Sequence, residues 1–191
     1  MPAQLVQAGR PEERMKNKFD GRPLHVLLAM AACSVLLNGC GILFQNHEKR
    51  ADATLEPTPG NSARGTITLI GRADGVQVTY NLTDMPPNSD HALEVHERGD
   101  CTAMTDQDAS PVFALQSDRR WANARLDGEL GNIRADTAGV ATGFIVATDV
   151  SLDGVRSVIT RAIMLHRDGT NPYTMSPHNV GPAITCGVIR R

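Results

Sequence analysis

The sequence predicts an all-β domain, a sandwich or a barrel, in the part of the chain that follows residue 64. Apolar and polar residues alternate with a period of two in several short stretches, and turn-forming residues separate these stretches. No stretch shows a sustained helical stripe of apolar residues. Short strands with regular turn signals are typical of β-sandwiches and β-barrels. Because only 4% of the residues are aromatic, the core must be mainly aliphatic.

The predicted strands begin with a hairpin. Residues 66–70 and 76–82 alternate, and Ala73-Asp74-Gly75 between them is a turn signal. A breaker cluster at residues 85–89 then precedes a strand at 92–97. Further strands are expected at residues 132–136, 140–147, 158–166 and 183–189.

Two irregular segments interrupt this pattern, at residues 102–123 and between Gly169 and Pro182. Connections of this length are often functional, so we expect any site to be built on them. The net charge of -2 and the pI of about 6.3 give no electrostatic case for a nucleic-acid partner.

Residues 1–40 are typical of an export signal with a lipobox. Basic residues precede an almost wholly apolar run, Leu24 to Leu37, which is shorter than the about 20 residues of a transmembrane helix. Leu37-Asn38-Gly39-Cys40 resembles a bacterial lipobox, in which the cysteine becomes the lipidated first residue. Met15 is a second candidate for the start of the chain. An ordinary signal cleaved nearby and a retained anchor are the alternatives. The basic residues are Arg14, Lys16, Lys18 and Arg22.

We therefore expect an exported protein of the bacterial periplasm or outer envelope, attached to the membrane by a lipid at Cys40. Residues 41–64 lack periodicity and are predicted to be a flexible tether, and residues 65–191 the folded domain. An oxidising compartment permits disulfides. Cys101 and Cys186 remain as an even pair after the signal and the lipidated cysteine are set aside, and one disulfide between them is the simplest account.

The strand expected at residues 92–97 carries two polar residues of the kind that bind metals. Glu94 and His96 are two positions apart, and such residues of a strand project from the same face. A sheet presents a pair of metal ligands or polar catalytic groups in this way. His91 falls on the opposite face and is expected to be structural.

Four motifs occur in an order that resembles the copper/zinc superoxide dismutase family, across about Gly65 to Arg191. They are His-x-x-x-x-His-Glu-x-Gly-Asp-Cys at 91–101, Gly-Glu-Leu-Gly-Asn-Ile-x-Ala-Asp at 128–136, Leu-His at 165–166 and Cys-Gly-Val-Ile at 186–189. The resemblance implies an eight-stranded Greek-key β-barrel with an intrasubunit disulfide, which Cys101 and Cys186 match. It leaves open whether the protein is a monomer or a homodimer.

The resemblance also implies a metal site with several ligands replaced. The family holds copper with four imidazoles, one of which bridges to a zinc ion held by two further His and an Asp. His96 and His166 match copper ligands, whereas Glu94 stands at the position of the first copper His and Val112 at that of the bridging His.

The zinc half of the site is replaced more completely. No His occurs between His96 and His166, Leu126 stands at the last zinc His, and Glu129 replaces the zinc Asp. Because zinc prefers four Cys, His or acidic ligands, we expect no zinc. Ala183 replaces the substrate-guiding arginine of the family, which removes a positive charge that would attract a small anion.

A residual copper site made by Glu94, His96 and His166 is left as the candidate site. Two His and one carboxylate suit iron, manganese, zinc or copper, depending on geometry. A carboxylate is a harder ligand than imidazole, so it favours Cu(II) over Cu(I) and hinders redox cycling. Met175 and His178 in the second irregular segment are further candidate ligands. The alternative is that the two His are packed, hydrogen-bonded residues without a metal.

Three functions follow from this pattern. The first is a superoxide dismutase-like envelope protein with lost or strongly reduced activity, acting as a binding or structural module. The second is a weakly active, copper-dependent superoxide dismutase that works through the residual site, and the third is a copper-binding protein without turnover. No organic cofactor is indicated, no residue is assigned a catalytic role, and the sequence does not identify a protein partner.

Overall fold

The computed structural model describes residues 48–102, 110–115, 125–171, 173 and 179–191. These residues form strands joined by turns and loops, with one described 3-10 helix. The elements are β1 (Arg50–Pro57), β2 (Arg64–Arg72), β3 (Gly75–Thr83), β4 (Asp90–Val95), β5 (Glu129–Arg134), β6 (Ala141–Ala147), η2 (Gly154–Arg156), β7 (Ala162–His166) and β8 (Ala183–Val188).

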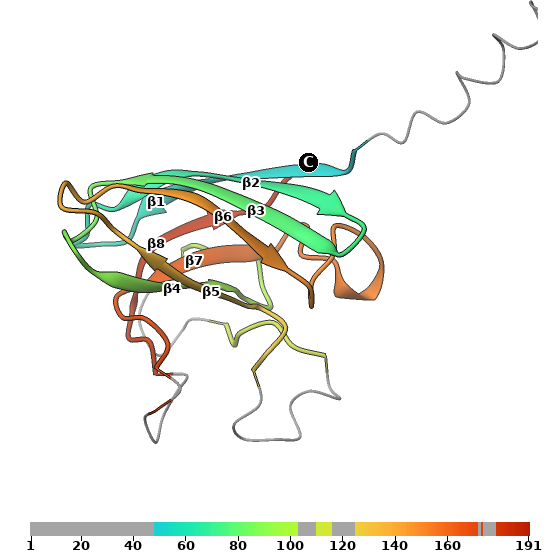
Figure 1. The fold of residues 1–191 in the computed structure, drawn as a ribbon. Coiled ribbons are helices and arrows are strands. Elements are labelled where there is room, and N and C mark those ends of the chain that lie inside the picture. Colours follow the sequence, from blue (N-terminus) through green and yellow to red (C-terminus); the bar gives the residue numbers. More distant parts are fainter. Residues whose placement is uncertain (1–47, 103–109, 116–124, 172, 174–178) are drawn as a thin grey trace, which may run out of the picture. The chain divides into compact units, whose positions relative to one another are not determined.

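The eight strands form a nearly closed antiparallel barrel. Neighbouring strands are hydrogen-bonded in the order β5-β4-β7-β8-β1-β2-β3-β6, and residues of the two end strands, β5 and β6, also contact each other. Figure 1 shows β1, β2, β3 and β6 as one layer and β4, β5, β7 and β8 as the other. The predicted all-β barrel fold is therefore confirmed.

The main core lies inside this barrel and is largely aliphatic. Ile67 and Leu69 of β2 are fully buried, as are Leu93 of β4 and Ile163 and Leu165 of β7. Because successive residues of a strand point to opposite faces, the residues between these positions lie outside the main core. In β4 and β7 those alternate positions carry the polar residues Glu94 and His166.

The prediction of a flexible tether over residues 41–64 is wrong for residues 50–57, which form β1. This strand pairs with β2 along six positions and with β8 through Glu56 and Pro57. Its buried residues are Ala51, Ala53 and Leu55, and the residues between them are exposed. Two of these three are alanines, so the apolar alternation is weak in the sequence. Residues 41–47, like the expected signal at 1–40, lie outside the described residues.

The strand expected at 158–166 is shorter in the structure, where β7 begins at Ala162. Thr160 has a φ of 65°, a left-handed conformation that no regular strand contains. Val158 is buried in the main core but does not belong to a strand. Its apolar side chain therefore resembles, in the sequence, a buried residue of a strand. The strand expected at 92–97 likewise ends at Val95, and His96 continues only as an isolated bridge to Val112.

Cys101 and Cys186 form a disulfide, as predicted, with a Cα–Cα distance of 5.9 Å. It joins the segment after β4 to β8 across a sequence separation of 85 residues. In the part of the chain that the structure describes, no helix is long and apolar enough to cross a membrane.

Replacing both Cys101 and Cys186 by Ser should lower the free energy of unfolding by about 2–4 kcal/mol, because the unfolded chain regains the freedom of a long loop. Chemical denaturation of the oxidised protein measures this loss. Reduced wild-type protein should match the double variant, and a reductant should not change the double variant. Equal stability of the oxidised protein and the variant would contradict the prediction.

Candidate metal centre

Strands β4 and β7 bring Glu94, His96 and His166 together on the outer face of one barrel layer. In β4, Leu93 and Val95 point into the main core, so Glu94 and the following His96 project from the opposite face. The same alternation in β7 places His166 on this face. All three side chains are buried. The structure thus joins the three residues predicted as a residual copper site.

Their ligand atoms are spaced as ligands of a single ion. The Nε2 atoms of His96 and His166 are 3.2 Å apart. Glu94 Oε2 lies 3.3 Å from Nε2 of His166 and 3.8 Å from Nε2 of His96. Two ligand atoms that are each about 2.0–2.1 Å from one ion are about 3.3 Å apart at the tetrahedral angle. Among the described residues, this is the one group of three His, Cys, Asp or Glu side chains that converges in this way.

Backbone carbonyls orient both imidazoles. His96 Nδ1 donates to the carbonyl oxygen of Ser110, and His166 Nδ1 donates to that of Gly181 at 2.8 Å. A carbonyl can only accept, so the proton sits on Nδ1 and the lone pair on Nε2. Each lone pair therefore faces the centre of the cluster, as a metal ligand requires. These carbonyls were not predicted, because every residue type carries the same backbone oxygen.

His91 is structural, as predicted, and it supports β7. Its Nδ1 is 2.8 Å from the carbonyl oxygen of His166, and its Nε2 is 2.6 Å from Ser89 Oγ. The ring is fully buried. His91 thereby fixes the backbone that carries His166 and offers no free nitrogen to the metal cluster.

The described part of the first irregular segment, residues 110–115, holds His96 in place. Val112 forms a bridge with His96, and the Phe113 N–H donates to the Val95 carbonyl at 2.8 Å. The guanidinium of Arg161 lies 4.0 Å from the centre of the Phe113 ring, a cation–π contact. Val112 therefore lies beside a candidate ligand, but its side chain has no atom that can bind a metal.

Burial sets the charge of the metal-free cluster. Burial and, to a smaller extent, the carboxylate of Glu129, its cross-strand partner, raise the pKa of Glu94 to about 8. Burial lowers the pKa of His96. At neutral pH Glu94 is then largely protonated and His96 neutral, so the Glu94 hydroxyl is a donor for Nε2 of His166, 3.3 Å away.

Leu126 and Glu129, which match zinc ligands of the family, do not form a zinc site with the neighbouring Asp127. Asp127 accepts from Arg156 Nη1 at 2.7 Å and from the Leu115 N–H at 2.9 Å. Glu129 accepts from the Leu126 N–H at 3.2 Å. Both carboxylates are engaged within the protein, and the Leu126 side chain has no donor atom. The absence of bound zinc stays a prediction.

The arginine that follows His166 is paired with a carboxylate. Ala183 pairs with His166 in the β7–β8 register, so a methyl group stands where the family has its guiding arginine. Arg167 lies against Gly181, and its guanidinium is paired with Asp168 at 2.8 Å. This hydrogen bond lowers the pKa of Asp168, which keeps it anionic and neutralises Arg167.

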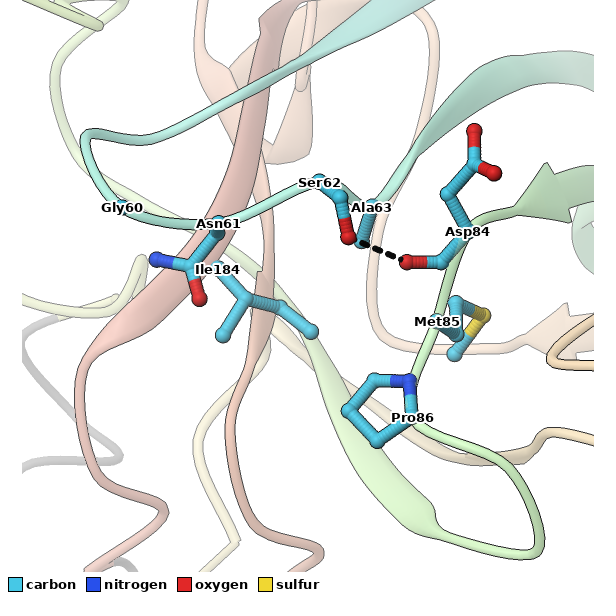
Figure 2. Close-up of a pocket in the computed structure, with 8 residues that line it drawn as sticks. All are labelled: Gly60, Asn61, Ser62, Ala63, Asp84, Met85, Pro86 and Ile184. Atoms are coloured by element: carbon cyan, nitrogen blue, oxygen red, sulfur yellow. Dashed lines mark hydrogen bonds between the residues drawn. The ribbon is translucent and has the colours of Figure 1, made fainter.

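A separate cavity of about 350 Å³ lies where the loops after β1 and β3 meet β8. Figure 2 shows the Ser62 hydroxyl joined to the Asp84 carbonyl oxygen at its rim, with Met85 and Ile184 among the apolar side chains nearby. None of the three residues of the metal cluster lines this cavity. The chemistry of the cluster is therefore independent of it.

The candidate ligands Met175 and His178 and the lipidation site Cys40 lie outside the described residues, so they stay predictions. The sequence indicated that Glu94 and His96 lie on a strand, but we expected the site to be built on the two irregular segments. In the structure the ligands come from β4 and β7 and from His96 directly after β4.

Comparison with known proteins shows what the chain is similar to. The family model described as copper/zinc superoxide dismutase (SODC) matches residues 63–189. The chain is 32% identical to a superoxide dismutase [Cu-Zn] of Candida glabrata, over 73% of this chain and 96% of that protein. It is 30% identical to one of Neurospora crassa, over 68% of this chain and 90% of that protein.

The buried Glu94 predicts a pH dependence in metal-free protein. The folded state holds the proton of Glu94 more tightly than the unfolded chain, where the pKa is near 4.5. The contribution of Glu94 to the free energy of unfolding should therefore be constant below pH 4.5 and should fall, by about 3–5 kcal/mol, as the pH rises to about 8.

Glu94→Gln should abolish this fall and should be more stable than wild type at pH 8.5. Denaturant titrations with a chelator, from pH 4.5 to 9, measure the difference between the two proteins. Glu56→Gln, an exposed substitution in β1, is the matched control and should follow wild type. A Glu94→Gln profile parallel to wild type would show that this carboxyl is ionised in the folded protein.

Proposed function

The chain belongs to the copper/zinc superoxide dismutase family, and we propose that it holds a copper ion with His96, His166 and Glu94 while its dismutase activity is lost or strongly reduced. The convergence of three ligand atoms within 4.8 Å of one another carries this proposal. Two imidazoles and a carboxylate suit a first-row metal ion, and the family supplies the identity of the ion as copper.

Copper, when bound, would supply one-electron redox chemistry. The protein contributes orientation: the carbonyls of Ser110 and Gly181 keep the two Nε2 lone pairs aimed at one point. Glu94 contributes a carboxylate that must lose its proton to act as a ligand. The buried surroundings restrict the access of water to the cluster.

Three replacements support impaired turnover. Glu94 is a hard ligand that disfavours Cu(I) relative to an imidazole, so the reduced half of a redox cycle is less accessible. Val112 beside His96 supplies no bridging ligand. Ala183 and the neutralised Arg167 provide little field to steer a small anion.

A weakly active, copper-dependent superoxide dismutase is the second candidate. The observation in its favour is that both imidazoles expected to match copper ligands are present with their Nε2 atoms 3.2 Å apart. The two candidates differ in rate and not in the site that they use, so a measured rate separates them.

We further propose that the protein is exported and lipid-anchored through Cys40 at the bacterial cell envelope. The basic start, the apolar run and the Leu37-Asn38-Gly39-Cys40 ending support this location. A compartment that permits disulfides agrees with the Cys101–Cys186 bridge.

Purified protein loaded with copper and desalted should retain about one copper per chain, measured by elemental analysis. His96→Ala and His166→Ala should each lose that copper, because each removes one of three ligand atoms. His47→Ala, in the chain before β1, is the control and should retain it. Copper retained by both site variants would sink the proposed site.

The same copper-loaded protein should dismutate superoxide far more slowly than the diffusion ceiling of about 10⁸–10⁹ M⁻¹s⁻¹. Pulse radiolysis or a stopped-flow assay gives the rate constant. A slow rate that disappears in His166→Ala would favour the weakly active enzyme. A rate within a few fold of the ceiling would overturn the claim of impairment and leave copper binding intact.

Cys40→Ser should release the protein from the membrane fraction into the soluble fraction of an expressing bacterium. Metabolic labelling with a fatty-acid analogue should mark wild type and not this variant. Cys33→Ser, within the apolar run, is the matched control and should stay labelled. An unlabelled wild-type protein would contradict the lipid anchor.

A further inference from the structure

We propose that Met164 supplies a thioether ligand to copper in the reduced state, so that His96, His166 and Met164 form a soft Cu(I) site. The inference deepens the proposed function and rests on copper binding at the cluster. Met164 lies in β7, and the family resemblance assigns it no role.

Met164 lies on the face of β7 that carries His166. Ile163 and Leu165 belong to the main core, whereas Ala162 and Met164 form a second, smaller apolar group with Cys186. Met164 and His166 are two positions apart, so their side chains project from the same face. Met164 is only 1% exposed, so its side chain is enclosed by the protein and not spread over the surface.

The strand register places Met164 directly opposite Glu94. The two residues are partners in the β4–β7 ladder, and Cys186 of β8 is the partner of Met164 on its other side. Side chains of directly opposite residues on one face start with their Cβ atoms about 4.5–5.5 Å apart. The position of Met164 in the sheet therefore lies between Glu94 of the metal cluster and Cys186 of the disulfide.

Among the described residues of this second apolar group, Met164 has the one long side chain. Its neighbours there are Ala162, Ala183 and the two disulfide cysteines. Ala183 is paired with His166. An alanine at position 183 is smaller than the arginine that the family resemblance implies there. Methionine has three rotatable bonds and a polarisable sulfur, so it adapts to irregular gaps.

A thioether changes which copper ion the site prefers. Soft sulfur ligands select Cu(I), whereas a carboxylate suits the harder Cu(II). With Glu94 for Cu(II) and its cross-strand partner Met164 for Cu(I), the two imidazoles can hold either oxidation state with a matched third ligand. A copper-holding protein built in this way keeps its ion when the surroundings become reducing.

The test uses the whole protein loaded anaerobically with Cu(I) in the presence of ascorbate. X-ray absorption at the copper edge should show two nitrogen ligands and one sulfur at about 2.3 Å. Met164→Leu should remove the sulfur scattering and weaken Cu(I) binding at least about tenfold in competition with a chromogenic Cu(I) chelator. Its Cu(II) affinity should change less than about twofold, because the two His and Glu94 are retained.

Two further leucine variants are the matched controls. Met85→Leu alters a methionine that is buried in the main core, and Met175→Leu alters one in the second irregular segment. Both should keep the sulfur signal. If Met164→Leu fails to fold, selenomethionine labelling of the Met175→Leu protein tests the same ligand, because selenium scattering should replace sulfur around Cu(I) although Met175 is absent.

The outcomes separate this inference from the function on which it rests. A wild-type Cu(I) site without sulfur, a signal that persists in Met164→Leu or one that vanishes in Met175→Leu would each overturn the thioether ligand while copper binding stands. If the wild-type Cu(I) site contains no sulfur, Met164 only packs near the site as an apolar side chain. Wild-type protein that binds neither Cu(I) nor Cu(II) would refute the proposed function itself.

Discussion

The pairing register of β4 with β7 is the constraint on which the rest of the structure depends. Leu93 lies opposite Leu165, and Glu94 lies opposite Met164, so the same two strands serve the core with one face and the cluster with the other. A shift of one residue would turn the aliphatic side chains outward and bury the acid and the imidazoles in the core. Packing and metal chemistry are therefore fixed by a single set of backbone hydrogen bonds.

Much of this arrangement is predictable from the sequence, because alternation and turn residues mark most strands and the motif order indicates the barrel. Two kinds of feature are not. The first strand is hidden, since Ala51 and Ala53 bury little apolar surface and weaken the period-two signal. The carbonyls that orient His96 and His166 are hidden too, because they depend on where Ser110 and Gly181 lie and not on what those residues are.

The structure also indicates how the barrel manages without the ligands of a zinc site. The segment beside the cluster is attached through Asp127, which joins Arg156 to the backbone of Leu115, and through Arg125, which donates to the carbonyl oxygen of Glu129. Hydrogen bonds and an ion pair thus hold a region that, in the family pattern, is tied by a metal. Such contacts need no ion to form.

The cluster draws its imidazoles from residues that are 70 positions apart. Of the three ligands of the cluster, an unfolded or newly exported chain holds only Glu94 and His96 close together. Strong retention of an ion thus begins only once β4 and β7 have met, a non-local event that comes late in the folding of a β-protein. An ion that binds the folded state alone also stabilises it by mass action. Copper occupancy would then act as a marker of maturation, carried by chains that have completed the barrel and absent from those that have not.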